Sequence, residues 1–285
     1  MESVPSRPSL WTRHSSILLG GFLLTIFLII YIWWPLAEEY LAYVPWDGHW
    51  WLYMDWLLIG IFLFMSLTII AGADLRTDSL VIFVGIFGGL AIESWGTQTN
   101  LWHYYTAERP PLWIIPAWPI ASLSIARLMR FLEFGFRKLR LLGSRSVQPS
   151  LPSSPPVLEA PAALVFRWLY WSIFLAFLIL MLIFVAPTLD KSYTVLSLLL
   201  CIGLVLTPTD HRTAVLTFVC GSALGYFLER WGTTRECWTY YTLQTPPLFA
   251  VLAHGMASVA FWRAGLMIKT LAHISLGRTK PPQPA

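Results

Sequence analysis

The chain has 285 residues, of which 56% are hydrophobic and only 12% are charged. Soluble domains contain about 45–50% apolar and about 25% charged residues, so the composition excludes an ordinary soluble protein and indicates an integral membrane protein. The formal net charge of +4 is expected to reflect membrane topology and contact with anionic lipid headgroups, and we expect no nucleic-acid partner.

The apolar stretches predict an all-α fold, a polytopic membrane protein with eight transmembrane helices. A helix that crosses the hydrocarbon core needs about 20 mostly apolar residues, and several of the stretches are shorter than this. In chain order, the predicted spans are residues 17–34, 54–71, 79–95, 112–128, 165–185, 192–206, 213–228 and 248–270.

The distribution of Lys and Arg predicts the orientation of these spans. With the N-terminus in the cytoplasm, fifteen of the nineteen basic residues fall in inner segments and four fall in outer segments. Short cytoplasmic loops carry an excess of Lys and Arg. We therefore predict that both termini are cytoplasmic and that the protein lies in the plasma or cell inner membrane.

The chain also repeats itself at an offset of 136 residues. Residues 74–122 align with 210–258 without a gap, and eleven of the twenty positions in 93–112 are identical to those in 229–248. A match of this density predicts an internal duplication. Because four spans separate equivalent positions, both copies have the same orientation, as in a parallel repeat about an axis along the membrane normal.

This repeat divides the chain into three parts. We predict a first four-helix membrane repeat at residues 1–133 and a second, homologous one at 163–285. Residues 134–162 between them are basic and then rich in Pro and Ser, a composition typical of a cytoplasmic linker.

Each copy places a carboxylate on a helix face that also carries glycines. Gly85, Gly89 and Glu93 occur at positions i, i+4 and i+8, so they share one face of a helix. Glycines on that face allow a neighbouring helix to approach closely. The carboxylate is therefore expected to point into the helix bundle.

Local signals predict where these helices begin and end. Thr77 and Thr213 are the expected N-caps, because a Thr hydroxyl can accept a hydrogen bond from the first free amides. Gly96 and Gly232 are expected to end the helices as the glycines that commonly follow the last helical turn. An outer loop of about fifteen residues, rich in aromatic side chains, follows in each copy.

Glu93, Glu229 and His254 are the candidate catalytic residues. An acidic residue that faces a helix bundle is costly and needs a partner, which marks both glutamates as candidate acid/base groups. His254 is expected at a depth similar to that of Glu229, where the two could exchange a proton. Two other interpretations stay open: the carboxylates accept hydrogen bonds from nearby indoles at the interface, and His254 is a packing residue.

Aromatic residues of the repeat are the candidate substrate-binding residues. Their π faces could stabilise a carbocation formed when an acid protonates an alkene, or they could form only an interfacial belt. Asp55 could complete an acidic lining or lie at the water boundary. The eight aromatic candidates are Trp95, Trp102, Tyr104, Tyr105, Trp231, Trp238, Tyr240 and Tyr241.

The sequence contains none of the common signals for a cofactor or metal. It has no nucleotide-binding glycine loop and no HExxH motif. Its three cysteines show no CxxC spacing. We therefore expect no cofactor and no metal.

The first copy, "GLAIESWGTQTNLWHYYTAERPPLWIIPAW", resembles the carotenoid-biosynthesis membrane family that includes the carotenoid hydratases. The resemblance covers about thirty residues. The second copy departs from it, because Arg235, Leu252 and His254 stand at the positions of Thr99, Pro116 and Trp118. The matching positions are Glu93, Gly96, Thr99, Tyr104, Tyr105, Thr106, Pro111, Pro116 and Trp118.

This resemblance implies acid-initiated hydration or cyclisation of a polyisoprenoid alkene, without metal or nucleotide. One hypothesis is therefore an enzyme, a metal-independent lyase or isomerase, that acts on a membrane lipid or isoprenoid at the extracytoplasmic side. The alternative is a non-enzymatic protein, either a carrier of a lipid or small solute or a membrane assembly factor. In that alternative, the repeated motif only holds the two halves together.

Overall fold

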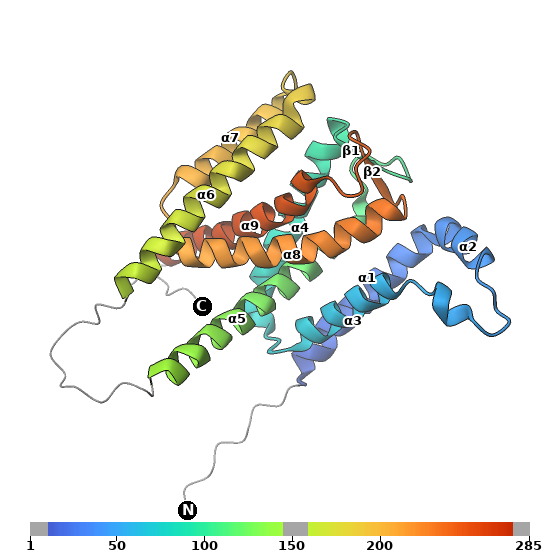
Figure 1. Ribbon diagram of the computed structural model, residues 1–285, viewed down its shortest axis with the longest axis horizontal. Coiled ribbons are helices and arrows are strands. Elements are labelled where there is room, and N and C mark those ends of the chain that lie inside the picture. Colours follow the sequence, from blue (N-terminus) through green and yellow to red (C-terminus); the bar gives the residue numbers. More distant parts are fainter. Residues whose placement is uncertain (1–10, 145–158, 276–285) are drawn as a thin grey trace, which may run out of the picture.

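The computed structural model describes residues 11–144 and 159–275, and the fold in this part is almost entirely helical (Figure 1). Two very short strands are present, β1 (Trp102–Tyr104) and β2 (Trp238–Tyr240). Three short 3-10 helices are η1 (Trp50–Tyr53), η2 (Leu112–Ile114) and η3 (Ala186–Thr188). The α-helices are α1 (Arg13–Ile32), α2 (Trp34–Ala42), α3 (Trp56–Ile70), α4 (Leu75–Gln98), α5 (Ala117–Ser144), α6 (Glu159–Val185), α7 (Ser192–Leu206), α8 (His211–Thr234) and α9 (Leu248–Ser275).

Each of the eight predicted apolar stretches overlaps one or more of these helices, so the all-α prediction is confirmed. Five helical segments in the described part are long and apolar enough to cross a membrane: Arg13–Ile32, Leu75–Gln98, Leu112–Phe136, Ala163–Thr188 and Leu248–Ser275. Helices α3 and α7 are apolar but have only 15 residues each. The chain is thus a multi-pass membrane protein by the length and composition of these five helices.

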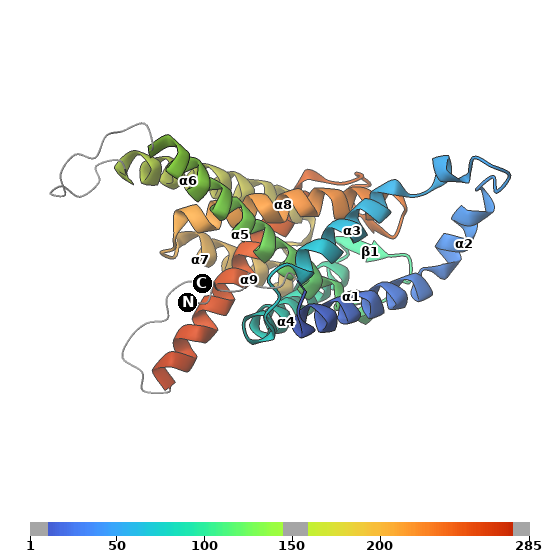
Figure 2. The ribbon, with the colours of Figure 1, turned by 90° about the horizontal axis from the view of Figure 1, so that it is seen from below.

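The centre of the fold contains α4, α5, α8 and α9, and the remaining helices flank them (Figures 1 and 2). On one side α1 packs along α3, and on the other side α6 packs along α7. Helix α4 contacts α9, and α8 contacts α5, so each half contributes a helix to the other half's central pair. This exchange places the repeated segments of the two halves against each other.

Helix α2 was not predicted. It lies between α1 and α3, in a connection from 33 to 55 that also contains η1, whereas only residues 186–191 connect α6 to α7. None of the nine residues of α2 is buried. Figure 1 shows α2 at one edge of the molecule, away from the central helices.

The predicted linker at 134–162 overlaps two helices at its ends. Helix α5 continues to Ser144 and α6 begins at Glu159. Both terminal portions of the predicted linker are therefore helical, and the Lys, Arg and Leu residues at the end of α5 are good helix formers. Residues 145–158 lie outside the described residues.

The predicted N-caps of the repeated helices were wrong by three positions. The structure has Asp74 and Asp210 as the N-caps, and each carboxylate accepts a hydrogen bond of 3.1 Å from the backbone amide two residues later. Thr213 instead donates its hydroxyl to the Asp210 carboxylate at 2.6 Å. Aspartate ranks among the best N-caps, so the helices begin before the threonines.

Gly96 and Gly232 do not end their helices, which continue to Gln98 and Thr234. A Cβ atom at either glycine would lie 1.9 Å from an aromatic ring, that of Trp102 or of Trp238. Glycine is therefore needed at these positions because a larger residue would clash with the tryptophan ring. A special backbone conformation does not require it.

The prediction that the glycine face receives a close neighbour is confirmed. A Cβ at Gly85 would lie 2.7 Å from the Pro119 backbone on α5, and a Cβ at Gly225 would lie 2.5 Å from His254 on α9. Helices α4 and α5, and likewise α8 and α9, therefore pack at a distance that only glycine permits. This contact brings Trp118 and His254 to the level of the carboxylates.

An ion pair that was not predicted joins α4 to α5 at the other end of the bundle. Arg127 donates two hydrogen bonds to Asp78, of 2.9 and 2.6 Å. The side chains of Arg127 and Asp78 are only 2% and 3% exposed. The second half has Ala214 at the position of Asp78, and Arg263 there donates to the last carbonyls of α7.

We predict that Asp78→Asn lowers the free energy of unfolding by about 3–5 kcal/mol, because it leaves the buried Arg127 charge without a partner. The matched control is Asp190→Asn, which removes an exposed ion pair with Lys191 and should change stability little. Thermal or SDS-induced unfolding of the purified protein measures both. Equal losses in the two variants would contradict the assignment.

Candidate functional site

Glu93 on α4 is the first of two buried carboxylates in the structure. Its relative exposure is 3%. Its Oε1 atom accepts hydrogen bonds from the Tyr104 hydroxyl at 2.9 Å and the Trp118 indole at 3.1 Å. Its Oε2 atom accepts a third from the Trp102 indole at 3.1 Å. The carboxylate therefore points into the bundle and is fully surrounded by donors.

Glu229 on α8 has the same arrangement and is 4% exposed. Its Oε1 atom accepts from the Tyr240 hydroxyl at 2.9 Å, and its Oε2 atom accepts from the Trp238 indole at 2.9 Å. The Nε2 atom of His254 lies 2.9 Å from Oε1 and donates when it carries the proton. Of the three predicted catalytic residues, the structure thus brings Glu229 and His254 into direct contact. Glu93 occupies a separate, equivalent site.

The contacts of the two carboxylates correspond one to one. In each copy, the donors lie 9, 11 and 25 residues after the glutamate. The hydroxyls of Thr97 and Thr233 also donate to the backbone carbonyls of the respective glutamates, both at 2.6 Å. The only change of residue type among the donors is Trp118 in one copy and His254 in the other.

The donors of one carboxylate contact the donors of the other. Strands β1 and β2 pair antiparallel, with Trp102 opposite Tyr240 and Tyr104 opposite Trp238. The ring centroids of these two pairs are 5.8 and 5.9 Å apart. The Trp118 ring stacks on His254 with centroids 5.7 Å apart and an interplanar angle of 18°. All three donor types therefore form part of the interface between the halves.

The other four predicted aromatic residues use their polar atoms elsewhere. The Trp95 indole donates to the Thr194 hydroxyl on α7 at 3.3 Å. Tyr105 donates to the carbonyl of Ile32 at the end of α1. In the second half, Trp231 donates to Asp55 on α3 at 2.8 Å, and Tyr241 donates to Phe184 on α6 at 2.6 Å. These residues link the ends of α4 and α8, and the loops after them, to the flanking helices α1, α3, α6 and α7.

Asp55 has a role that neither sequence interpretation foresaw. Its carboxylate N-caps α3 by accepting from the amide of Leu58 at 3.1 Å. The same side chain accepts hydrogen bonds from Trp231 and from the Arg235 Nε atom, the latter at 3.1 Å. It therefore ties the start of α3 in the first half to the end of α8 in the second half.

The two tyrosines beside the carboxylates are permanent donors. Burial raises the pKa of the Tyr104 and Tyr240 hydroxyls well above its ordinary value, and the neighbouring glutamates raise it further. Both hydroxyls therefore keep their protons at any physiological pH. A hydroxyl that cannot ionise donates its hydrogen bond to the carboxylate without interruption.

The arrangement limits the chemistry that the carboxylates can perform. A carboxylate has about four lone-pair sites, and three are occupied here by side chains of the same half. Histidine is the side chain that most often serves as a general acid or base, so Glu229 with His254 is the pair best suited to proton exchange. Among residues 11–144 and 159–275, no group of three or more His, Cys, Asp or Glu side chains could hold a metal ion.

Two features of this site were missed by the sequence-based predictions. Trp118 is a carboxylate donor, although sequence analysis placed it only within the family resemblance. The glycines at 96 and 232 were assigned to helix ends, whereas they accommodate the donor indoles. The offset of 25 residues between glutamate and last donor was the available signal, because it recurs in both copies.

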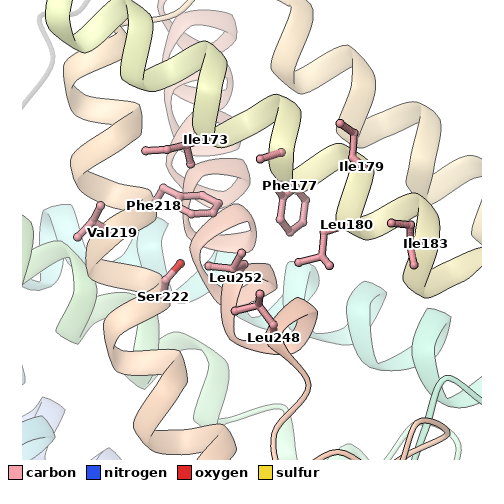
Figure 3. Close-up of a pocket in the computed structure, with 11 residues that line it drawn as sticks. Ile173, Phe177, Ile179, Leu180, Ile183, Phe218, Val219, Ser222, Leu248 and Leu252 are labelled. Carbon is pink, nitrogen blue, oxygen red and sulfur yellow. The ribbon is translucent and has the colours of Figure 1, made fainter.

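A second feature is an apolar groove of about 650 Å³ bounded by α6, α8 and α9 (Figure 3). Phe177, Phe218 and Leu252 contribute to its walls, and Ser222 is its only hydroxyl-bearing lining residue. A volume of this size is within the range of about 300–1,000 Å³ that is typical of small-molecule sites. The groove lies in the second half of the chain.

Comparisons of the chain with protein-family models, with curated proteins and with solved structures find no match.

We predict that Gly96→Ala and Gly232→Ala each lower the free energy of unfolding by about 1–3 kcal/mol, because the new methyl group displaces the donor ring. Gly203→Ala on α7 is the matched control, since a Cβ there meets nothing within 4 Å. This control should be neutral or stabilising by about 0.5–1 kcal/mol. Thermal unfolding in detergent measures all three, and a Gly96→Ala protein as stable as Gly203→Ala would refute the assigned role.

Proposed function

We propose that the chain spans the membrane eight times as two homologous four-helix repeats, and that it binds a membrane lipid or isoprenoid without chemically changing it. Both termini lie in the cytoplasm, and the repeated carboxylate motif fastens the two halves together near the extracytoplasmic side. The protein is a carrier in this proposal, and the carboxylates are part of its scaffold.

One observation favours a non-enzymatic role over catalysis. Each buried carboxylate already accepts three hydrogen bonds from its own half. A general acid must lie within hydrogen-bond reach of the atom that it protonates. At Glu93 and Glu229, that reach is occupied by Trp, Tyr and His side chains.

The duplication is supported by the boundaries of the elements. Helices α3 and α7, α4 and α8, and strands β1 and β2 begin and end at positions that differ by 136 residues. At the centre of the strand pair the equivalent residues His103 and Thr239 face each other, and the two flanking pairs, Trp102 with Tyr240 and Tyr104 with Trp238, are related by exchange of the halves. Such an arrangement is expected of two copies related by a pseudo-twofold axis along the membrane normal.

The eight-span topology is supported by α8 and by the positions of the helix ends. Helix α8 packs against α5, α6 and α9, and about half of its residues are buried, so it needs less apolar sequence than a helix that faces lipid on most sides. Its 24 residues correspond to a length of about 36 Å. Hydrogen bonds join the ends of α1 and α6 to the loops after α4 and α8, as alternating spans require.

We predict that Glu93→Gln and Glu229→Gln each reduce stability by about 1–3 kcal/mol and reduce accumulation of the protein. In each variant the Gln NH₂ group, itself a donor, faces the indole N–H or phenol O–H donors that a carboxylate oxygen accepted. Buried donors are then left without acceptors. The matched control is Glu108→Gln, at an exposed position in the loop that follows β1. This variant should accumulate normally. Quantitative immunoblotting and thermal unfolding measure the effect.

A second function, acid-initiated hydration or cyclisation of an isoprenoid, is favoured by the Glu229 and His254 contact. It predicts a different result for the same variants. Glu229→Gln would then accumulate normally and change the lipid inventory of the membrane, while Glu93→Gln would leave that inventory unchanged. This outcome would overturn the non-enzymatic proposal.

The topology has its own test in a chain whose three native cysteines are replaced. Glu108→Cys and Gln244→Cys lie at equivalent exposed positions of the two loops and should react with a membrane-impermeant maleimide added to intact cells. Arg76→Cys, exposed at the opposite end of α4, should react only after lysis. Protection of both loop positions in intact cells would overturn the orientation.

A further inference from the structure

The guanidinium group of Arg212 lies between two aromatic rings at the start of α8. Its Cζ atom is 6.0 Å from the ring centroid of Phe136 on α5 and 6.0 Å from that of Phe166 on α6. Both distances are within the range of about 6 Å that is typical of cation–π contacts. The Arg212 side chain is half-buried, so the two rings fix the guanidinium group at a place where three helices meet.

This guanidinium group has no acceptor within residues 11–144 and 159–275. The backbone amide of Arg212 donates to the Asp210 carboxylate at 3.1 Å, but the side chain makes no hydrogen bond or ion pair with the described residues. A guanidinium group carries five N–H donors in a planar fork that matches the geometry of a phosphate or carboxylate. Donors that are free and held in position favour an anionic ligand.

The ends of the apolar helical segments indicate the depth of Arg212 in the membrane. The apolar segment Leu112–Phe136 ends at one of the two rings, and Ala163–Thr188 begins three residues before the other. Helix α8 begins at His211, one residue before Arg212. In Figure 1 these three helix ends lie on the same side of the molecule. Since lipid headgroups lie just outside the hydrocarbon core, the guanidinium group lies at the depth of the headgroup phosphates.

Exposed apolar side chains lie within two residues of each ring. Phe134 on α5 is 64% exposed, and Leu164 and Trp168 on α6 are 54% and 67% exposed. A free phosphate ion makes no use of such side chains. A phospholipid has both an anionic group for the guanidinium and acyl chains for the apolar surface, so the combination favours a phospholipid.

The charge of this region favours an anionic phospholipid. Residues 130–140 contain four basic residues and one acidic residue, Glu133. Lys138 and Arg167 are exposed on α5 and α6. Basic clusters at the cytoplasmic end of a transmembrane helix attract anionic lipids, whereas the positive group of a zwitterionic lipid is repelled there.

The first half has the same motif without the rings. Arg76 is equivalent to Arg212 and follows the N-cap Asp74 in the same way, with its amide 3.1 Å from the carboxylate. The Arg76 side chain is exposed, and no aromatic ring of a described residue lies over it. The aromatic contacts are therefore specific to the second half, and Arg76 is a matched control for Arg212.

We propose that Arg212, held by Phe136 and Phe166, binds the phosphate group of an anionic phospholipid, whose acyl chains lie against the exposed apolar side chains of α5 and α6. The guanidinium group donates two parallel hydrogen bonds to the phosphate oxygens. The site is separate from the proposed carrier function, and only the assignment of the lipid to the cytoplasmic leaflet rests on the proposed topology.

The test uses native mass spectrometry of the full-length protein in a neutral detergent, titrated with phosphatidylglycerol or with phosphatidylcholine. Wild type is expected to bind phosphatidylglycerol saturably and several-fold more tightly than phosphatidylcholine. Arg212→Gln should weaken phosphatidylglycerol binding about fivefold, the effect of one basic residue near an anionic headgroup, and should leave phosphatidylcholine binding unchanged. Arg76→Gln should bind both lipids within about twofold of wild type, because surface changes away from a site have small effects.

Inorganic phosphate distinguishes a lipid from a free anion. At equal ionic strength, phosphate is expected to displace no more phosphatidylglycerol than chloride does, because it lacks the acyl chains. Stronger displacement by phosphate, together with equal binding of the two lipids, would assign the site to a free anion and overturn the proposal.

Equal weakening by Arg76→Gln and Arg212→Gln would also overturn it, since the attraction would then come from charge in general. If Arg212→Gln does not fold, Arg212→Lys takes its place. Lysine keeps the charge but lacks the planar fork, so unchanged phosphatidylglycerol binding in Arg212→Lys would contradict the assigned contact. Binding in detergent does not depend on orientation or on carrier activity, so failure of this proposal leaves the proposed function standing.

Discussion

The rest of the structure depends on the hydrogen bonds that two buried carboxylates accept from aromatic side chains. Glu93 and Glu229 each hold two indole or imidazole rings and one phenol in fixed positions. Those rings, and the strands that carry four of them, form the contact between the halves. A buried carboxyl group is costly without hydrogen-bond partners, so loss of the carboxyl group or of its donors is expected to weaken the interface.

The duplicated halves share this scaffold and differ in individual polar residues beside it. His254 replaces Trp118 beside the second carboxylate, and Ser222 replaces Ile86 on the helix face next to the groove. Conversely, the first half alone has the buried pair of Asp78 with Arg127, near the ends of α4 and α5 that lie away from the carboxylates. The two halves therefore share the carboxylate framework and differ in their buried polar pairs, Glu229 with His254 in the second half and Asp78 with Arg127 in the first.

The sequence predicted the helices well and their mutual contacts poorly, for physical reasons. Hydrophobic runs are local in the sequence, and the 136-residue repeat is found by comparing the sequence with itself. Both therefore identify the helices and the two repeat copies without a structure. The partner of Glu93 on α5 depends on how closely Gly89 lets the helices approach, which requires three-dimensional packing. The role of Gly96 was missed because a helix-ending glycine and a ring-accommodating glycine look alike in sequence. Helix α2 was missed because its nine residues are too few for a membrane span, although its Leu, Ala and Glu residues are good helix formers.

The most direct test of the central claim is a cross-link between the halves. His103 and Thr239 face each other in the strand pair, so His103→Cys with Thr239→Cys, in a chain without native cysteines, should form a disulfide rapidly under mild oxidation. If the carboxylates position the strands, adding Glu93→Gln will slow this cross-link markedly, whereas adding Glu108→Gln will not. An unchanged cross-linking rate with Glu93→Gln would show that the halves pair without the carboxylate and would contradict the account.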